Sequence, residues 1–377
     1  MSKTLQDYAT LINDTIQSNE INHYITTDNM CQNLGGIDTF KNINIPQGKV
    51  RSFQKDDVLL SNIRLYFRKV YRAKQKGGCS SDVLVFRAKH IDSTTLFAIL
   101  SSQIFTDYAC SGSQGSKMPR GNKTHMMNFK IPTINFTITK IFNSIQNKIE
   151  NNHKINELLH KILELLYEQY FVRFDFLDEN NKPYQTSGGK MKFSKELNRL
   201  IPSGWSVRFL NHKIVSTYQP KTISKTLLND SYSYSVYGGG GIIGRFTEYN
   251  HEQSEFIISC RGQCGISYLT LPKSWITGNA MVIRPTKSYT SKTYLYHTIN
   301  KYKLTNYITG SVQPQITRQN LSTMPILIPK RKTLSKWNNI SSLLWNLIHN
   351  NMQSTQTLTA LRDFLLPLLL KQQVKPQ

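Results

Sequence analysis

The chain has 377 residues, enough for two or three domains and for a sizeable hydrophobic core. Its 47 Lys and Arg residues outnumber 23 Asp and Glu residues, and the formal net charge of +24 favours a polyanionic partner such as nucleic acid over a basic face that docks an acidic protein. The five cysteines indicate neither a disulfide framework nor a zinc site, and we expect a cytoplasmic protein because the sequence shows no signal peptide and no membrane-spanning run.

Residues 1–134 are expected to form a first, mainly β domain. It should begin with a short helix over residues 4–16. Short apolar runs separated by turn residues predict strands near residues 23–27, 58–61 and 83–86. Residues 94–105 (TTLFAILSSQIF) carry apolar side chains at helical spacing and predict one helix.

A polar loop, SGSQGSKMPRGNKT (residues 111–124), is the candidate nucleic-acid contact of this domain. Small residues let the backbone approach a phosphate, Ser and Gln can bond bases or phosphates, and Lys and Arg supply positive charge. The predicted contact residues are Ser113, Gln114, Lys117, Arg120 and Lys123.

Residues 135–182 predict a long central helix, because apolar side chains recur there at alternating steps of four and three. This heptad pattern is typical of a helix that packs against another helix, and two polar residues, Lys148 and Asn152, occupy positions in the seam. The apolar seam positions are Ile141, Ile145, Ile155, Leu159, Ile162 and Leu166.

Residues 183–332 predict a second β-rich domain, with strands near residues 233–237, 255–259, 280–283 and 324–328. Residues 239–244 (GGGIIG) match the dinucleotide-binding pattern literally, but the residues that follow predict a strand and a turn where that site needs a helix. A glycine-rich hairpin that brings the backbone close to a ligand fits better. Its candidate contacts are Tyr237, Gly239 and Gly240.

A second polar loop, GSVQPQITRQN (residues 310–320), parallels the first. Gln suits adenine and Arg suits guanine in the major groove, so this loop is the candidate contact of the second domain. Its predicted contact residues are Ser311, Gln313, Gln315 and Arg318.

Residues 333–377 predict a second long helix with a cleaner heptad pattern. The two helices could pair as an antiparallel coiled coil that holds the two domains apart. The seam of the second helix would consist of Ile340, Leu344, Leu347, Asn351, Ser354, Leu358, Leu361, Leu365 and Leu368.

The chain also repeats itself. Val85 and Arg87 follow Arg64 at the same separations at which Val282 and Arg284 follow Arg261. The phrases GS (112–113) and IP (131–132) recur as GS (310–311) and IP (328–329). The predicted fold class is therefore α+β, with an internal pseudo-twofold repeat. Arg64 and Arg261, which head the two copies, are further candidate DNA contacts.

No catalytic motif stands out. The segment NKPY (residues 181–184) differs by one residue from a motif of amino-methyltransferases, but Lys182 breaks it and it lies in a charged linker. The scattered histidines assemble no nucleophile with a base and an orienting group.

The order and duplication of these phrases resemble the specificity (S) subunit of a type I restriction-modification enzyme. The resemblance covers nearly all of the chain, although residues 1–134 lack a copy of the PSGW phrase. The phrases that carry it, besides the repeated GS and IP pairs, are IPSGW (201–205), YGGGGIIG (237–244), NNHKINELL (151–159) and its echo NNMQS (350–354).

The resemblance implies two target-recognition domains, 1–134 and 183–332, that each read half of a bipartite double-stranded DNA target. The helices at 135–182 and 333–377 would set the spacing and dock two modification (methyltransferase) subunits and a restriction/translocase subunit. S-adenosylmethionine, ATP and Mg would be used by those partners, so this chain would carry no cofactor and would not be an enzyme. The implied subunit-interface residues are Ile155, Leu159, Ile162, Leu166, Leu358, Leu361 and Leu365.

Two other hypotheses remain open from the residues alone. The chain could be a self-contained DNA methyltransferase or nuclease, which would turn over DNA by itself. It could also be a non-specific basic coiled-coil interaction protein, which would show no sequence preference.

Overall fold

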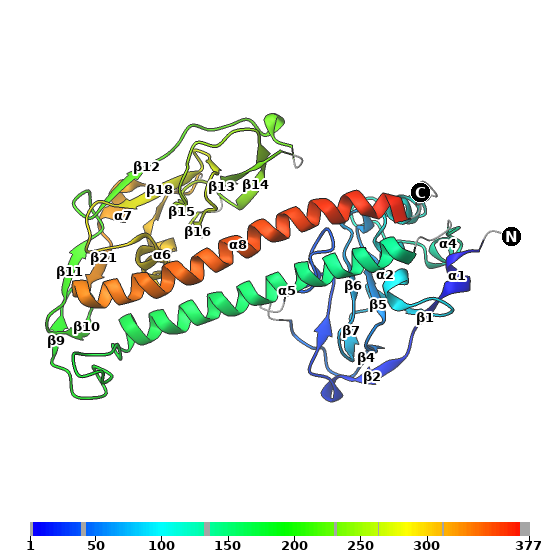
Figure 1. The fold of residues 1–377 in the computed structure, drawn as a ribbon, viewed down its shortest axis with the longest axis horizontal. Coiled ribbons are helices and arrows are strands. Elements are labelled where there is room, and N and C mark those ends of the chain that lie inside the picture. Colours follow the sequence, from blue (N-terminus) through cyan, green and yellow to red (C-terminus); the bar gives the residue numbers. More distant parts are fainter. Residues whose placement is uncertain are drawn as a thin grey trace. The chain divides into compact units, whose positions relative to one another are not determined.

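The computed structural model describes residues 3–38, 43–131, 136–229, 232–262, 264–310 and 313–369. The chain divides into two compact units, unit 1 with Met1–Ile155 and Asn351–Gln377, and unit 2 with Asn156–Asn350. Each unit combines a β-rich part with portions of the two long helices, α5 (Phe136–Tyr167) and α8 (Arg331–Leu369) (Figure 1). The mixed α+β class predicted from the sequence is confirmed.

Unit 1 contains two four-stranded sheets. The first is antiparallel and has the order β1-β8-β5-β6, and in the second, β2-β4-β7-β3, only the β3–β7 pair is parallel. The strands are β1 (Ala9–Ile12), β2 (Thr15–Gln17), β3 (Tyr24–Ile25), β4 (Lys49–Phe53), β5 (Val58–Ser61), β6 (Val70–Arg72), β7 (Gly77–Cys79) and β8 (Val83–Ala88). The helices before α5 are α1 (Leu5–Tyr8), η1 (Ser18–Glu20), η2 (Leu65–Phe67), α2 (Ser93–Ser101), α3 (Gln103–Ser111) and α4 (Lys123–Met127).

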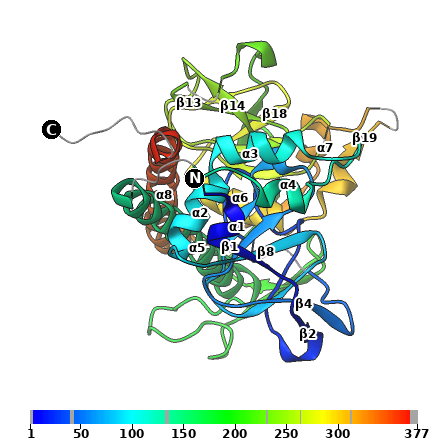
Figure 2. The ribbon, with the colours of Figure 1, turned by 90° about the vertical axis from the view of Figure 1, so that its right-hand side faces the viewer.

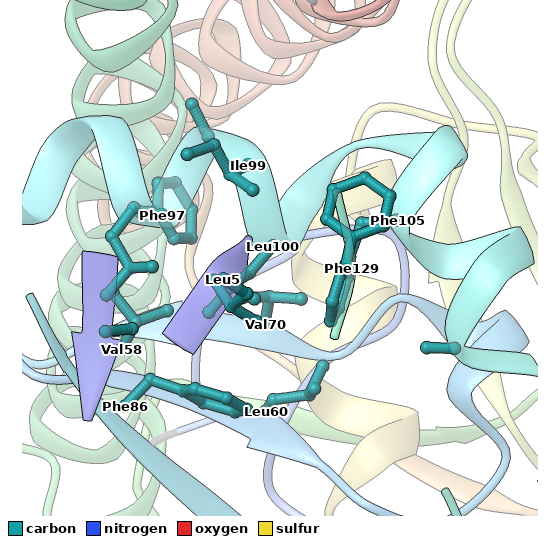
Figure 3. Close-up of a cluster of buried hydrophobic side chains, with 14 of the residues drawn as sticks. Leu5, Val58, Leu60, Val70, Phe86, Phe97, Ile99, Leu100, Phe105 and Phe129 are labelled. Carbon is teal, nitrogen blue, oxygen red and sulfur yellow. The ribbon is translucent and has the colours of Figure 1, made fainter. Parts of the chain in front are cut away.

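The central strand β5 explains how unit 1 builds its core. Successive side chains of a strand point to opposite faces. Val58 and Leu60 therefore enter one apolar cluster with Phe86, while Leu59 enters a second cluster on the other face (Figure 3). Because both faces are covered, β5 reads as a continuous apolar run in the sequence. Helix α2 lies between this sheet and α5 (Figure 1, Figure 2), where Phe97 contacts Phe142 with 5.7 Å between ring centroids.

Two helical predictions in this unit are corrected. The single helix expected over residues 94–105 is two helices, α2 and α3, because Ser102 has extended backbone. The Ser102 hydroxyl accepts a bond from the Phe105 N–H and donates one to the Ile99 carbonyl, so it closes one helix and caps the next. The helix expected over residues 4–16 is the single turn α1, because Ala9–Ile12 pairs instead with β8.

Unit 2 has an antiparallel sheet of the order β12-β18-β15-β16 and a three-stranded sheet, β14-β13-β17, besides three two-stranded pairs, β9–β10, β11–β21 and β19–β20. Its strands are β9 (Met191–Ser194), β10 (Arg199–Pro202), β11 (Ser206–Phe209), β12 (Val215–Tyr218), β13 (Tyr234–Gly238), β14 (Gly241–Phe246), β15 (Phe256–Ser259), β16 (Ser267–Leu269), β17 (Trp275–Ile276), β18 (Ala280–Pro285), β19 (Ile308–Thr309), β20 (Gln315–Ile316) and β21 (Pro325–Ile328). Its helices, besides α5 and α8, are η3 (Glu168–Val172, a π-helical turn), η4 (Lys225–Leu227), α6 (Lys292–Asn300), η5 (Leu304–Tyr307) and α7 (Arg318–Ser322).

The two antiparallel four-stranded sheets share one strand order, first-fourth-second-third along the chain. An ion pair also recurs. The Arg87 guanidinium makes two bonds of 2.8 Å to buried Asp57, and Arg284 bonds buried Glu255 in the same way. Arg87 and Arg284 of the sequence repeat are thus each engaged by a carboxylate that directly precedes the neighbouring strand.

The backbone bonds at the ends of these sheets correct one detail of the sequence alignment. One backbone hydrogen bond recurs directly after the second strand of each sheet. Asn62 N–H donates to the Asp82 carbonyl in unit 1, and Cys260 N–H donates to the Asn279 carbonyl in unit 2. These bonds place Cys260 at the position of Asn62. Arg261 therefore matches Ile63, one residue earlier than the sequence repeat suggests.

Helices α5 and α8 run antiparallel within each unit. In unit 1, the Asn152 amide donates to the Thr355 hydroxyl at 3.1 Å, and Arg362 donates to the Gln146 amide oxygen at 3.2 Å. In unit 2, the Asn156 amide donates to the Ile348 carbonyl at 3.3 Å. Residues later in α5 therefore contact residues earlier in α8, as antiparallel helices do.

The predicted heptad seam is only partly buried. Ile145 is buried, but Ile155, Ile162 and Leu361 are 43%, 44% and 44% exposed. The helices bury a different set because the portion of each helix in a unit also packs against the β-rich part of that unit. Heptad spacing alone does not say which side of a helix does so. The most buried apolar residues of the two helices are Phe142, Ile149, Leu163, Leu334, Trp337, Ile348 and Leu366.

Among the described residues, no helix is long and apolar enough to cross a membrane. In the same part of the chain, no group of three or more His, Cys, Asp and Glu side chains is arranged to hold a metal ion.

Candidate nucleic-acid interface

In unit 1, the tertiary structure brings Arg64 to the polar loop that follows α3. The Arg64 N–H donates to the Pro119 carbonyl at 2.9 Å, and Ile63 forms a β-bridge with Arg120. Gln114 and Arg120 exchange two backbone bonds of 2.9 and 2.8 Å, which close the loop on itself. The predicted contact residues of this unit, far apart in the sequence, therefore lie on one small patch.

The side chains of this loop differ in what they offer. Gln114, Lys117 and Lys123 are exposed, whereas the Ser113 hydroxyl is half-buried and donates to the Ala109 carbonyl at 3.1 Å. Arg120 is 61% exposed and bonds the Asp82 carboxylate at 3.0 Å. The loop thus presents amide and cationic groups to solvent, the groups that contact bases and phosphates.

Arg64 itself is partly turned inward. Its backbone is left-handed, with φ of 50°, and its guanidinium makes one long bond of 3.5 Å to the Lys117 carbonyl. Its Nε is buried without a hydrogen-bond partner among the described residues. In this conformation both the backbone and the side chain of Arg64 are bonded to the loop, and a contact of Arg64 with DNA remains a prediction.

In unit 2, three predicted elements meet. A Cβ atom on Gly239 would lie 2.9 Å from the Arg261 carbonyl, so the glycine lets the β13–β14 hairpin approach the turn after β15. Arg261 in turn forms a β-bridge with Gln315, and the Ile316 N–H donates to the Cys260 carbonyl at 3.1 Å. The hairpin, the turn and the second polar loop therefore form one patch.

The hairpin predicted at residues 239–244 is confirmed. Gly238 pairs with Gly241, whose φ of +96° suits glycine, and β14 follows where a dinucleotide site would need a helix. Gly240 at the tip is exposed.

Tyr237 corrects the sequence expectation. Its ring is 3% exposed, its hydroxyl accepts a bond from the Leu271 N–H at 3.1 Å, and burial raises its pKa to about 12. The ring belongs to the core because it packs with Ile257, Ile276 and Val282 in an apolar cluster, whereas Gly240 at the hairpin tip is exposed.

Arg261, Gln313, Gln315 and Arg318 are exposed, and Ser311 lies outside the described residues. A cavity of about 500 Å³ opens beside Arg318 and is also lined by Asn211, His212, Ser216 and Thr217. The sequence analysis did not select these residues, because no polar motif marks the segment before β12. It also missed Asp82, which lies outside the polar loop in the sequence.

The portions of the long helices in each unit also carry exposed apolar side chains. They include Leu158 and Leu343 in unit 2, at 61% each, and Phe364 in unit 1, at 68%. Of the predicted interface residues, Ile155, Ile162 and Leu361 are exposed, and the half-buried ones are Leu159, Leu166, Leu358 and Leu365. Large contiguous apolar patches, unlike single exposed residues, mark interaction surfaces.

Residues 202–361 match the family model of the type I restriction modification DNA specificity domain. The structure is similar to the crystal structure of a type I restriction-modification system S subunit from M. genitalium, with a TM-score of 0.62 and 13% identity over 99% of this chain and 96% of that one. A search of curated proteins found no match.

Two further solved structures resemble the chain more loosely. The HsdS subunit from Thermoanaerobacter tengcongensis has a TM-score of 0.35 and 15% identity over 99% of this chain and 96% of that one. A structure of complex assembly in the type I R-M system has a TM-score of 0.36 and 14% identity over 99% and 97%. The fold assignment depends on the first structure alone. Residues 202–361 therefore match the DNA specificity domain of type I restriction-modification systems, the chain has the fold of a specificity subunit, and the resemblance seen in the sequence is confirmed.

Proposed function

We propose that this chain is the sequence-specific DNA-binding subunit of a type I restriction-modification complex, and that each β-rich unit reads one half of a bipartite target. One observation carries the proposal. Two units with the same sheet order each present a polar loop tied by a β-bridge to the turn after the second strand, with Arg120 exposed in one and Gln315 in the other. Exposed Arg and Gln side chains suit base edges in the major groove.

The net charge of +24 supports duplex DNA as the ligand. Lys117, Lys123 and Arg318 lie within the two loops and would contact phosphates, while the loop amides and Arg120 would contact bases. The target-recognition domains would comprise residues 1–134 and 183–332.

The long helices would act as spacer and scaffold. Antiparallel contacts within each unit favour a coiled coil formed by residues 135–182 and 333–377, with approximate twofold symmetry. Their exposed apolar side chains would dock two modification subunits, and a restriction subunit would join them. S-adenosylmethionine, ATP and Mg would be used by those cytoplasmic partners, so this chain would be non-catalytic.

The test is to purify the chain in complex with the modification subunits of its system and to map methylated sites in a random-sequence duplex library. We expect one asymmetric sequence with two specified parts and an unspecified spacer. Methylation without any bipartite preference would refute the proposal in favour of a non-specific basic protein. Turnover of DNA by the isolated chain with S-adenosylmethionine or Mg²⁺ would instead identify an enzyme.

A further inference from the structure

The Arg120 side chain is held from two directions. Its backbone is fixed by two bonds to Gln114 and by the bridge to Ile63, and its guanidinium bonds the Asp82 carboxylate at 3.0 Å. Asp82 is itself fixed, because its carbonyl accepts the Asn62 N–H at 2.8 Å in the turn before β8. The turn that holds Asn62 and Ile63 follows β5, and Asp82 directly precedes β8. Both strands belong to the same sheet.

This ion pair contributes little to stability. Arg120 is 61% exposed and Asp82 is 33% exposed, and ion pairs with such access to water add little to folding free energy. A carboxylate bound to one end of a guanidinium does, however, fix the plane of the fork. The remaining N–H groups can then meet two adjacent acceptors, such as O6 and N7 of guanine.

Unit 2 has a different pair of residues at the same two positions. Gln315 forms the equivalent bridge to the turn after β15 and, like Arg120, lies three residues before the first residue of the following helix. Asn279 directly precedes β18 as Asp82 precedes β8, and its carbonyl accepts the equivalent bond at 3.0 Å. A charged pair in unit 1 thus corresponds to a neutral pair in unit 2, and both Asn279 and Gln315 are exposed.

We infer that this matched position reads one base in each half-site, with Arg120, oriented by Asp82, selecting guanine and Gln315 selecting adenine. The inference rests on the proposed function and names Asp82 as a positioning residue. Asp82 would touch no base itself. Its role would be to hold the guanidinium in one plane, since a freely rotating cation would attract phosphates without distinguishing bases.

The test compares the complete complex carrying wild-type chain, Asp82→Asn or Asp56→Asn in selection from a random-sequence duplex library. For Asp82→Asn we expect the preference for guanine to fall about tenfold at one position of one half-site, with every other position unchanged. Asp56→Asn is the matched control, because it removes a carboxylate 4.0 Å from Arg72 at the opposite end of β5. It should leave every preference unchanged.

A second variant separates orientation from charge. Arg120→Lys keeps the cation but loses the planar fork, so it should lose the guanine preference and keep the wild-type salt dependence of binding. The double variant Asp82→Asn with Arg120→Gln copies unit 2 and should select adenine at that position. Melting temperatures within a degree or two of wild type would show that these exposed sites do not disturb the fold.

The outcomes distinguish the two proposals. A wild-type complex that selects no bipartite sequence would refute the proposed function. A wild-type complex that does so, together with an Asp82→Asn variant of unchanged or uniformly weakened preferences, would overturn only the inference. An altered preference in the half-site read by unit 2 would overturn it as well.

Discussion

Two buried histidines of unit 2, His297 and His349, should make that unit sensitive to acid. His160, His297 and His349 surround Trp345, with ring centroids 5.0, 6.4 and 5.8 Å from it. His297 and His349 are 9% and 8% exposed, and their Nε2 atoms have no hydrogen-bond partner among the described residues. Burial lowers the pKa of His297 to about 3 and that of His349 to about 4.

The charged groups that face these rings reinforce the effect. His160 and Lys301 act on His297, and Lys292 and His160 act on His349; all of them disfavour an added positive charge. Both histidines therefore stay neutral in folded unit 2 at pH values where the unfolded chain has taken up a proton. The unfolding free energy that depends on these neutral rings is fully present above an ordinary histidine pKa of about 6.5. It is lost as the pH falls below that value.

At pH 5, each histidine should cost about 2 kcal/mol of unfolding free energy, so the pair should cost about 4 kcal/mol. That is a large part of the roughly 5–15 kcal/mol that stabilises a typical domain. Urea unfolding followed by tryptophan fluorescence measures it in unit 2 alone, because all four tryptophans, Trp205, Trp275, Trp337 and Trp345, lie there.

The comparison is between wild type, the double variant His297→Phe with His349→Phe, and His212→Gln, which changes an exposed histidine of the same unit. We expect the difference in unfolding free energy between pH 8 and pH 5 to shrink by about 4 kcal/mol in the double variant only. A double variant with the pH dependence of wild type would refute the reasoning.

Three further outcomes follow from the fold and the proposed function. Arg87→Met leaves Asp57, which is 2% exposed, with its charge unpaired, so unit 1 should lose about 3 kcal/mol; unchanged hydrogen exchange in β5 would contradict this. Leu361→Asp should spare folding, because the side chain is 44% exposed, but should reduce binding of modification subunits in a pull-down assay; equal binding would exclude this surface. Inserting matched heptads into both α5 and α8 should lengthen the spacer of the methylated sequence, and an unchanged spacer would argue against the ruler.

The sequence predicted the elements whose pattern is local. The buried strand at residues 58–61 and the glycine-rich hairpin appear where their pattern indicates. Both long helices are present, but the helix predicted over residues 135–182 ends at Tyr167 and continues only as a π-helical turn to Val172. The predicted helix over 94–105 was wrong because the Ser102 side chain can either continue a helix or cap one, and packing of α2 and α3 against the sheet selects capping.

The side on which a helix packs could not be inferred in the same way. Heptad spacing indicates that α5 and α8 each have an apolar stripe, but the helices carry more apolar residues than a two-helix contact can cover. The β-rich parts decide which of them are buried, which is why Phe142 lies in the core and Leu361 lies at the surface.

By itself, the sequence determined the charge, the repeat and the chemical types of the loop residues, because these are properties of composition and order. Only the tertiary structure decided which of these residues meet. The bridges from Ile63 to Arg120 and from Arg261 to Gln315 join segments far apart in the chain. The Asp82 carboxylate likewise pairs with Arg120 of the distant polar loop. Such contacts depend on strand order and register, which a linear pattern does not encode because local spacing carries no information about distant pairing.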